Sequence, residues 1–513
     1  MKKLLLLCLP FAATLAMAQK GDDASAKYAA LITQQGLKEK LTILASDEME
    51  GRETASPGQR KAAAYIEDFF KKLGLKPGNG DSYQQLYPVY QEVLNEKNLR
   101  VNGRSFEWDK DFIFSMQTVS TGTLTYNGVV FAGYGMVDSA TKVNDYAGLD
   151  VKGKLVLVLD GGTTAAPAGG GRGFGGPAMA KMNAARRNGA AGILIISADF
   201  PRANPTSVKG RMSITLPTAS ANASNFLVAT VSEEVASALL GRTARISQAD
   251  LKTTAKGNYV SEVVIHTAKK VETLESSNVI GILPGTDKKA EYVFLTGHYD
   301  HLGKQGNTIY YGADDDGSGT VGVMQMAEAF AAAAKKGDKP RRTMIFMTVS
   351  GEEKGLLGSA YYADHPTVDM TKVSVDLNTD MIGRGDASRK GDTLNYIYVI
   401  GHDKLSSDLA PINESVNKQY VNIALDYKYD DPNDQNRIYY RSDHYNFAKK
   451  GVPILFFYDG MLGADYHRPT DTVDKIQFGI MEQRTKLVFH TAWVIANRDE
   501  MLKRDIPLTM PAR

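Results

Sequence analysis

Apolar residues recur along the chain in two rhythms, which predict two kinds of structure. Helical spacing over 28–44 and 59–73 predicts two helices near the N-terminus, and the second closes on Gly74, a common helix stop. From about residue 122 the apolar positions form short runs rich in valine, isoleucine and leucine, such as 128–135 and 155–159. Because glycine and aspartate bound these runs, we expect β-strands there.

Beyond Asn278, apolar strands alternate with amphipathic helices. Strands are expected over 292–296, 343–349 and 373–377, with a helix over 319–334. This alternation is typical of a mostly parallel sheet covered by helices on both faces. The expected fold class is therefore α/β.

The first residues have the order of a secretory signal peptide. Lys2 and Lys3 precede an apolar run over 4–16, and small residues follow up to Ala18. This order predicts cleavage after Ala18 and an exported protein, periplasmic or extracellular. A lipoprotein modified at Cys8, the only cysteine, is the alternative, but no small residue precedes Cys8. The apolar run is too short to span a membrane, and no later stretch is long enough.

Charge and composition narrow the classes of partner. The chain has 513 residues, with 60 basic and 58 acidic side chains, a net charge of +2 and no long run of one sign. Nothing in this balance indicates binding to nucleic acid or to an anionic membrane surface. A glycine-rich stretch over 165–176 contains Gly171, Gly173 and Gly176 in the spacing of a dinucleotide fingerprint. Because about ten loosely spaced residues separate it from the preceding strand, we expect a surface loop instead.

Metal-binding side chains follow the predicted strands of the C-terminal half. In an open α/β sheet, ligands gather beyond the carboxyl ends of the strands. The segments concerned are 297–301 (Gly-His-Tyr-Asp-His), 312–319 (Gly-Ala-Asp-Asp-Asp-Gly-Ser-Gly), 350–353 (Ser-Gly-Glu-Glu), 378–383 (Asn-Thr-Asp-Met-Ile-Gly) and 465–472 (Asp-Tyr-His-Arg-Pro-Thr-Asp-Thr). Each alone is weak, since acidic pairs are often surface residues and aspartates often begin helices. Their coincidence at strand ends, with mixed imidazole and carboxylate donors, favours zinc, and the spacing of an EF-hand calcium loop is absent.

This ordered set of motifs resembles the family of two-zinc aminopeptidases, whose relatives include glutamate carboxypeptidases, glutaminyl cyclases and transferrin receptors. The resemblance covers nearly the whole mature chain. The segment 145–154 further resembles a protease-associated domain inserted in some members. The implied organisation is a signal peptide (1–18), the first part of the peptidase domain (19–121), a β-rich α+β protease-associated insertion (122–267) and the catalytic zinc peptidase domain (268–513).

The resemblance also implies residue roles. His298 and Asp380 would bind one Zn²⁺, Glu353 and His467 the other, and Asp315 would bridge both. Glu352 matches the general base. Asp300 matches the carboxylate that orients the ligating histidine, and a cis peptide bond is expected between Asp315 and Asp316.

These roles agree with elementary electrostatics. Two Zn²⁺ bring four positive charges, three carboxylate ligands bring three negative ones, and a bridging hydroxide would make the cluster neutral. Glu352 could then move the proton from water to the leaving amine. The expected reaction is removal of the N-terminal residue from peptides with a free amino terminus, and the sequence leaves the oligomeric state open.

Several alternatives stay open. A binding protein of the transferrin-receptor type would have lost ligands, and a glutaminyl cyclase would hold one metal. A carboxypeptidase would need a basic pocket, for which Arg384, Arg437 and Arg441 are available. Pocket residues are expected before His467 and beside it, namely Asp443, His444 and Tyr466.

Overall fold

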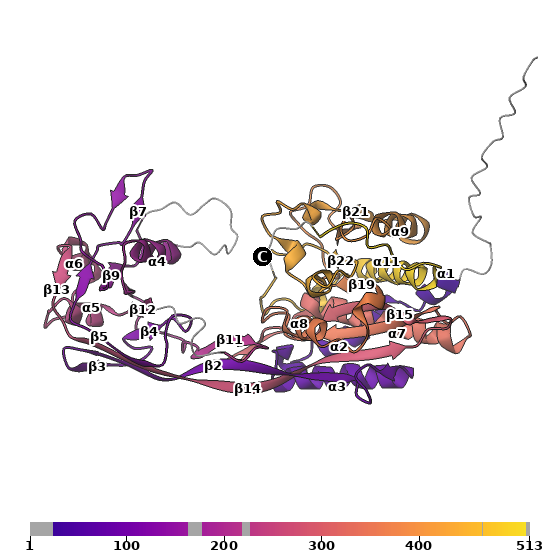
Figure 1. Ribbon diagram of the computed structural model, residues 1–513, viewed down its shortest axis with the longest axis horizontal. Helices are drawn as coiled ribbons and strands as arrows, with labels where there is room; N and C mark the ends of the chain where they lie inside the picture. The colour runs from indigo at the N-terminus through magenta and orange to yellow at the C-terminus, as the bar shows by residue number, and fades with distance from the viewer. Residues whose placement is uncertain (1–23, 163–176, 218–225, 464, 509–513) are drawn as a thin grey trace, which may run out of the picture. The chain divides into compact units, whose positions relative to one another are not determined.

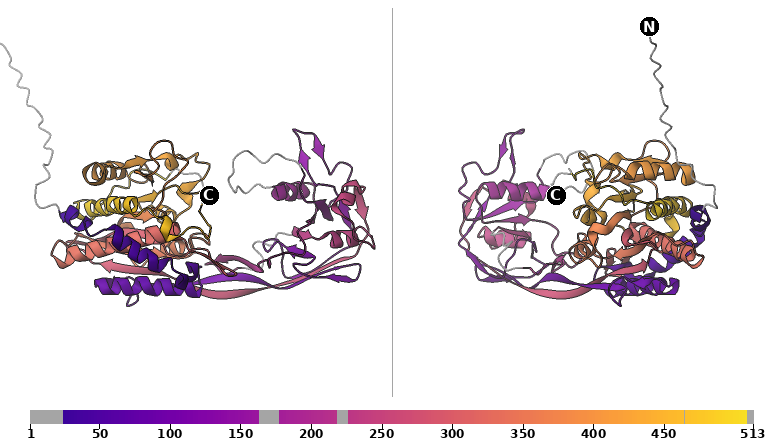
Figure 2. Two further views of the ribbon diagram at one scale, coloured as in Figure 1. Left: turned by 180° about the vertical axis from the view of Figure 1, so that it is seen from behind. Right: turned by 45° about the vertical axis from the view of Figure 1, so that its right-hand side comes forward.

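The structure is a computed structural model, and it describes residues 24–162, 177–217, 226–463 and 465–508 (Figures 1 and 2). The chain divides into two compact units. Unit 1 contains the residues up to Tyr87 together with Ser276–Arg513, and unit 2 is Pro88–Glu275. Two long strands, β2 (Gln84–Val101) and β14 (Val263–Leu283), carry the chain out of unit 1 and back.

Unit 1 is built on a sheet whose central strands are parallel. The strands β18, β15, β19 and β22 neighbour one another in that order and pair in parallel, while β14 and β20 pair antiparallel at either side. Every residue of β18, β19, β20 and β22 is buried, as expected for a sheet covered on both faces. The bounds are β1 (Lys76–Pro77), β15 (Lys288–His298), β18 (Arg342–Val349), β19 (Val373–Thr379), β20 (Tyr396–Ile400), β21 (Ala424–Asp426) and β22 (Ile454–Tyr458).

Helices cover both faces of this sheet (Figure 1). The helices α7 and α11 lie against β15, β18 and β19, and α1, α2 and α3 pack on them; α8 and α10 cover the opposite face. Successive residues of β15 alternate between the two cores, with Val293 and Leu295 in one and Phe294 in the other. The helices are α1 (Ala24–Ala29), α2 (Gln34–Leu44), α3 (Pro57–Leu73), α7 (Gly319–Lys335), α8 (Leu357–Asp364), α9 (Leu409–Val416), α10 (His444–Ala448) and α11 (Phe478–Asn497).

Unit 2 contains a sheet of its own with the order β13-β6-β9-β10-β12-β4. Its four inner strands are parallel, and β13 and β4 pair antiparallel at the edges. Helix α4 packs on the face that contains Val156, and α5 and α6 pack on the face that contains Leu155. The bounds are β4 (Phe112–Phe114), β6 (Val129–Phe131), β9 (Leu155–Leu159), β10 (Gly192–Ile196), β12 (Leu227–Val231), β13 (Gly257–Tyr259), α4 (Pro177–Arg187), α5 (Glu233–Leu239) and α6 (Gln248–Thr253); β3 (Arg104–Phe106), β5 (Gly122–Tyr126) and β11 (Lys209–Ser213) pair with β2 or β14.

The predicted α/β fold class is confirmed, with local differences. The predicted helix over 28–44 is split into α1 and α2, because Thr33 caps α2 by accepting a hydrogen bond from the Gly36 amide. The predicted strand over 128–135 ends at Phe131, since Gly133 and Gly135 turn the chain with φ of 62° and 65°.

Two further expectations concern segment boundaries. Unit 2 begins before and ends after the predicted insertion at 122–267, because β2, β3 and β4 also belong to it. The predicted signal peptide (1–18) and the glycine-rich loop (165–176) lie outside the described residues. No helix within the described ranges is long and apolar enough to cross a membrane.

Candidate functional site

The five predicted ligands gather at one edge of the sheet of unit 1. Three of these positions lie at or just beyond the ends of β15, β18 and β19, because neighbouring parallel strands end at the same edge. The fourth lies in the helical turn η2 (Ala313–Ser318), which leads into α7, and the fifth lies in the loop after β22. In order, the residues are His298, Glu353 and Asp380, then Asp315, then His467.

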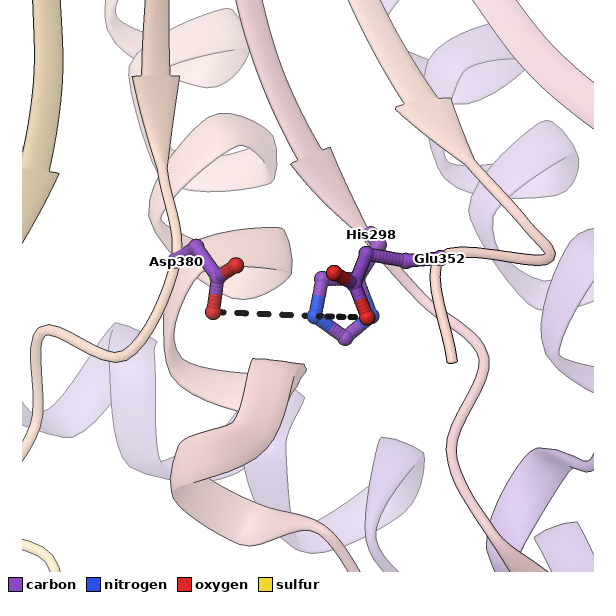
Figure 3. Close-up of side chains that lie close together, drawn as sticks. All are labelled: His298, Glu352 and Asp380. Atoms are coloured by element: carbon purple, nitrogen blue, oxygen red, sulfur yellow. Dashed lines mark ion pairs between the residues drawn. The ribbon is translucent and has the colours of Figure 1, made fainter. Parts of the chain in front are cut away.

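The first cluster consists of His298, Glu352 and Asp380, which converge from the ends of three neighbouring strands (Figure 3). Nε2 of His298 is 3.6 Å from Oδ1 of Asp380 and 3.9 Å from Oε2 of Glu352. The same nitrogen is 3.3 Å from Oδ1 of Asp315. Burial raises the pKa of Glu352 well above its usual range, and the charge of Glu353 adds to the effect.

The second cluster contains Asp315, Glu353 and two histidines. Nε2 of His467 is 3.2 Å from Oδ2 of Asp315 and 3.1 Å from Oε2 of Glu353. Asp315 therefore points one carboxylate oxygen at each cluster. His301 completes the group, with Nδ1 2.8 Å from Oε1 of Glu353. His301 was not predicted as a site residue, and its only signal in the sequence is that it shares a strand-end loop with His298.

Asp316 and a glycine shape the loop that carries Asp315. The Asp315–Asp316 peptide bond is cis, as the resemblance implied. The Asp316 carboxylate accepts hydrogen bonds from the amides of His298, Gly319 and Met381, at 2.8 to 3.1 Å, and so ties three segments together. Gly312 has a φ of +55°, and a Cβ there would lie 2.4 Å from Cγ of His301, so a larger residue does not fit.

The carboxylate of Asp300, which was predicted to orient His298, forms an ion pair with that ring, but the backbone of Asp300 makes the shorter contact. Nδ1 of His298 is 3.1 Å from the main-chain oxygen of Asp300, whereas the carboxylate Oδ1 is 3.7 Å away. The carboxylate also accepts hydrogen bonds from the Glu352 amide at 3.2 Å and from the Thr54 hydroxyl at 2.6 Å. Asp300 thus orients the histidine through its backbone and fixes the loop of Glu352 through its side chain.

Three residues that support the site were missed in the sequence. Arg52, which is fully buried, donates hydrogen bonds to four main-chain oxygens, those of residues 44, 299, 311 and 312. Thr54 binds Asp300, and Asp471 accepts the amides of residues 314 and 315. Arg52 and Thr54 lie in none of the predicted motifs, and their partners lie 8 to 260 positions away along the chain. Asp471 lies in the 465–472 segment, but no role was predicted for it.

A pocket opens onto the first cluster and onto Asp315, the residue that both clusters share. Its wall contains charged, aromatic and apolar side chains. The lining residues are Asp315, Glu352, Asp380, Met381, Ile438, Arg441, Phe456, Tyr458, Leu462 and Tyr466. Tyr466 therefore lies where a pocket residue was predicted, and its ring stacks on His467 at a centroid distance of 3.9 Å.

Asp443 and His444 do not line this pocket. His444 is a buried core residue, because its ring stacks on Phe456 and its Nε2 bonds the Tyr439 carbonyl oxygen. Burial lowers the pKa of His444 to about 3, so the ring stays neutral. Asp443 is also buried and accepts a hydrogen bond from Ser359, and burial raises its pKa to about 7. The prediction of a pocket histidine at 444 is wrong.

The donor atoms in both clusters fit zinc ions. Among the described residues, the buried atoms that form no hydrogen bond include His298 Nε2, Asp315 Oδ2, Glu353 Oε1 and both ring nitrogens of His301, although Glu353 Oε1 and His301 Nδ1 lie 2.8 Å apart as an ion pair. Unpaired buried polar atoms are costly, so their concentration in one place indicates a cation that pairs them. Imidazole and carboxylate donors are a ligand set that zinc accepts.

Comparison with known families agrees with this site. Residues 278–492 match the model of "Peptidase family M28" and residues 120–236 match the "PA domain". The chain contains an M28 peptidase domain and a PA domain. The M28 domain holds every residue of both clusters, and the predicted family and its inserted domain are confirmed.

Curated relatives of the M28 domain carry peptidase names. A "Probable leucine aminopeptidase" of Trichophyton verrucosum is 30% identical over 224 residues, which are 43% of this chain and 57% of that protein. An aminopeptidase of Bacillus subtilis is 26% identical over 235 residues, 44% of this chain and 46% of that protein. The chain thus spans less than two thirds of the length of these relatives.

Solved structures share the fold over most of the chain. An aminopeptidase from Aneurinibacillus sp. strain AM-1 has a TM-score of 0.55 and 20% identity, and the likeness covers 94% of this chain and 99% of that one. A zinc aminopeptidase from Bacillus subtilis has a TM-score of 0.53 and 20% identity, with the same coverage. At this identity the likeness describes the fold alone.

Proposed function

We propose that this protein is an exported metallopeptidase that uses two zinc ions to remove N-terminal residues from peptides. The observation that carries the proposal is the pair of clusters that share Asp315 while Glu352 lies at the first of them. A bridging carboxylate between two ligand sets is the arrangement that a two-metal hydrolase needs. The names of the curated relatives support the aminopeptidase activity.

Each ligand has a place in this proposal. His298 and Asp380 would hold one Zn²⁺, Glu353 and His467 would hold the other, and Asp315 would contribute to both sites. The three carboxylate ligands leave one positive charge on the pair, which favours an anionic reactant. Two bound Zn²⁺ polarise the scissile carbonyl and lower the pKa of water to about 7.

Glu352 has the task of moving the proton. Its carboxylate lies at the first cluster and lines the pocket, so it reaches a water that attacks a carbonyl there. Glu352 accepts the proton of that water and returns it to the departing amine, which leaves as a neutral group. The amide of Glu352, bonded to Asp300, holds the side chain at this position.

Export is part of the same proposal, and residues 1–18 are its support. Expression in a host that secretes by the general pathway, followed by N-terminal sequencing, tests it. We expect a mature protein that begins at Gln19. A cytoplasmic product that retains Lys2 and Lys3 argues against export.

Peptides blocked at one end test the direction of cleavage. Purified protein loaded with zinc is incubated with one pentapeptide in three forms: free, acetylated at the N-terminus, and amidated at the C-terminus. We expect the free and amidated peptides to lose their first residue and the acetylated one to stay intact. Loss of the last residue from the acetylated peptide would establish a carboxypeptidase instead. Release of ammonia from a glutaminyl peptide would establish a cyclase.

A further inference from the structure

The wall of the pocket holds one arginine, Arg441, that forms no ion pair among the described residues. Of the three arginines that the sequence offers, only Arg441 lines the pocket. Arg384 is paired with Asp465 at 3.1 Å, and Arg437 is exposed and lies over the Tyr440 ring. Within the described residues, no carboxylate oxygen lies within 4.0 Å of Arg441 in an ion pair, and the one hydrogen bond that its guanidinium makes is to the Tyr466 hydroxyl, at 3.0 Å.

A second side chain with a polar group lines the same pocket. Tyr458 lines the pocket with 3% of its surface exposed, and its hydroxyl has no hydrogen-bond partner among the described residues. Tyr458 and Arg441 lie close enough to interact electrostatically. A buried hydroxyl without a hydrogen-bond partner and a half-buried guanidinium without an ion pair are both costly, so a ligand that supplies acceptor oxygens would stabilise this corner of the pocket.

The apolar walls of the pocket favour an anion over water beside Arg441. Met381, Ile438, Phe456 and Leu462 form the apolar part of the lining. Apolar walls exclude water and strengthen the attraction between a guanidinium and an opposite charge. Arginine also presents two parallel N–H groups that match the two oxygens of a carboxylate.

We propose that the Arg441 guanidinium and the Tyr458 hydroxyl form a subsite that binds a carboxylate of the substrate. The proposal rests on the proposed function, because it assigns a substrate class to the same pocket. The carboxylate has two sources in peptides. It is the side chain of an N-terminal aspartate or glutamate, or the free C-terminus of a peptide so short that it ends inside the pocket.

Pairs of substrates that differ only in this charge test the subsite. Glutamic acid α-p-nitroanilide and glutamine p-nitroanilide differ in the side chain alone, and leucyl-leucine and its amide differ in the C-terminus alone. We expect the zinc-loaded protein to prefer the charged member of one pair by about 10- to 100-fold in kcat/KM, the usual effect of a charge-assisted contact. The pair that shows the preference identifies the source of the carboxylate.

Variants separate this role from a structural one. Arg441→Met is expected to lower kcat/KM for the charged member far more than for the neutral member, so that the preference disappears, and Tyr458→Phe is expected to remove part of it. Arg437→Met is the matched control, since that arginine lies on the same segment but is exposed. The subsite would be overturned if neither pair showed a preference, or if Arg441→Met lowered kcat/KM equally for the charged and the neutral member. Arg441 would then only support Tyr466.

Binding provides a readout that does not need turnover. Calorimetric titration with L-glutamate and L-glutamine compares two ligands that have the same α-amino and α-carboxylate groups. If the subsite binds a side-chain carboxylate, glutamate binds more tightly than glutamine, and Arg441→Met removes the difference. This result supports the subsite even if no anilide is hydrolysed, an outcome that would refute only the proposed activity. Equal binding of both ligands, together with equal hydrolysis of leucyl-leucine and its amide, would refute the subsite while the activity stands.

Discussion

Arg52 provides a sharp test of how the site is held together. Its guanidinium is fully buried and donates to the main-chain oxygens of Leu44, Tyr299, Tyr311 and Gly312 at 2.7 to 3.0 Å. Two of these oxygens belong to the loops that carry the metal ligands. Arg52 therefore connects the N-terminal helices to the site, and its own carbonyl accepts the amide of His301 at 3.2 Å.

The cost of removing Arg52 follows from these contacts. Arg52→Met leaves the carbonyl oxygens of Leu44, Tyr299 and Tyr311 without donors, while the Gly312 oxygen keeps the amide of Gly317 at 3.1 Å. At about 1 kcal/mol for each of these three stranded acceptors, the lower end of the usual range, the free energy of unfolding falls by about 3 kcal/mol. A native protein has a free energy of unfolding of about 5–15 kcal/mol in total, so this loss is a large part of it. Arg60→Met is the control, because Arg60 is exposed and donates only to the Ala55 oxygen, at 3.1 Å.

The assay must follow unit 1 alone, because a chain of two units need not unfold in one step. The chain has two tryptophans, Trp108 in unit 2 and Trp493 in unit 1. In a Trp108→Phe background, the fluorescence of Trp493 during urea denaturation reports on unit 1. A loss below about 1 kcal/mol in Arg52→Met, or a loss no larger than in Arg60→Met, would refute the reasoning.

Three further predictions concern the site and its surroundings. Glu352→Gln is expected to keep its zinc by elemental analysis while kcat falls by about 10² to 10⁴, the scale of a lost general base, and loss of zinc instead would mean that a ligand was removed. His301→Ala removes the ring beside Glu353 and is expected to weaken zinc binding by about 10- to 100-fold in a chelator competition; unchanged affinity would count against this role. Burial depresses the pKa of His444 from 6.5 to about 3, so as the pH falls the imidazole is protonated in the unfolded chain before it is protonated in the folded one. The wild-type protein should therefore lose stability relative to His444→Gln as the pH falls from 6.5 toward 3. The expected difference is about 1.4 kcal/mol per pH unit in denaturant titrations, and a difference independent of pH contradicts a buried neutral ring.

The clusters could be predicted from the sequence because their residues lie at or near the ends of strands. Apolar runs identified β15, β18 and β19, and the polar residues that follow them converge wherever such strands are neighbours. Asp315 could be assigned as a ligand only through the family resemblance, because three successive aspartates precede the helix and the pattern alone does not choose among them. The middle aspartate contacts both clusters, whereas Asp316 accepts backbone amides.

The supports of the site could not be predicted in this way. Arg52 acts through contacts with residues up to 260 positions away, and nothing in its own segment distinguishes it from a surface arginine. His444 illustrates the opposite failure, because it follows Asp443 directly but its ring packs on Phe456 in the core. Neighbours in sequence at the start of a short helix point in different directions, so one residue of a motif does not place the next.

Zinc titration of the metal-free protein tests the central claim most directly. Protein stripped with a chelator is titrated with Zn²⁺ while hydrolysis of leucine p-nitroanilide and bound zinc are followed together. We predict no hydrolysis without metal, and full activity when two zinc ions are bound per chain. Activity that survives complete removal of the metal, or that reaches its maximum at one bound zinc, would contradict the two-zinc account.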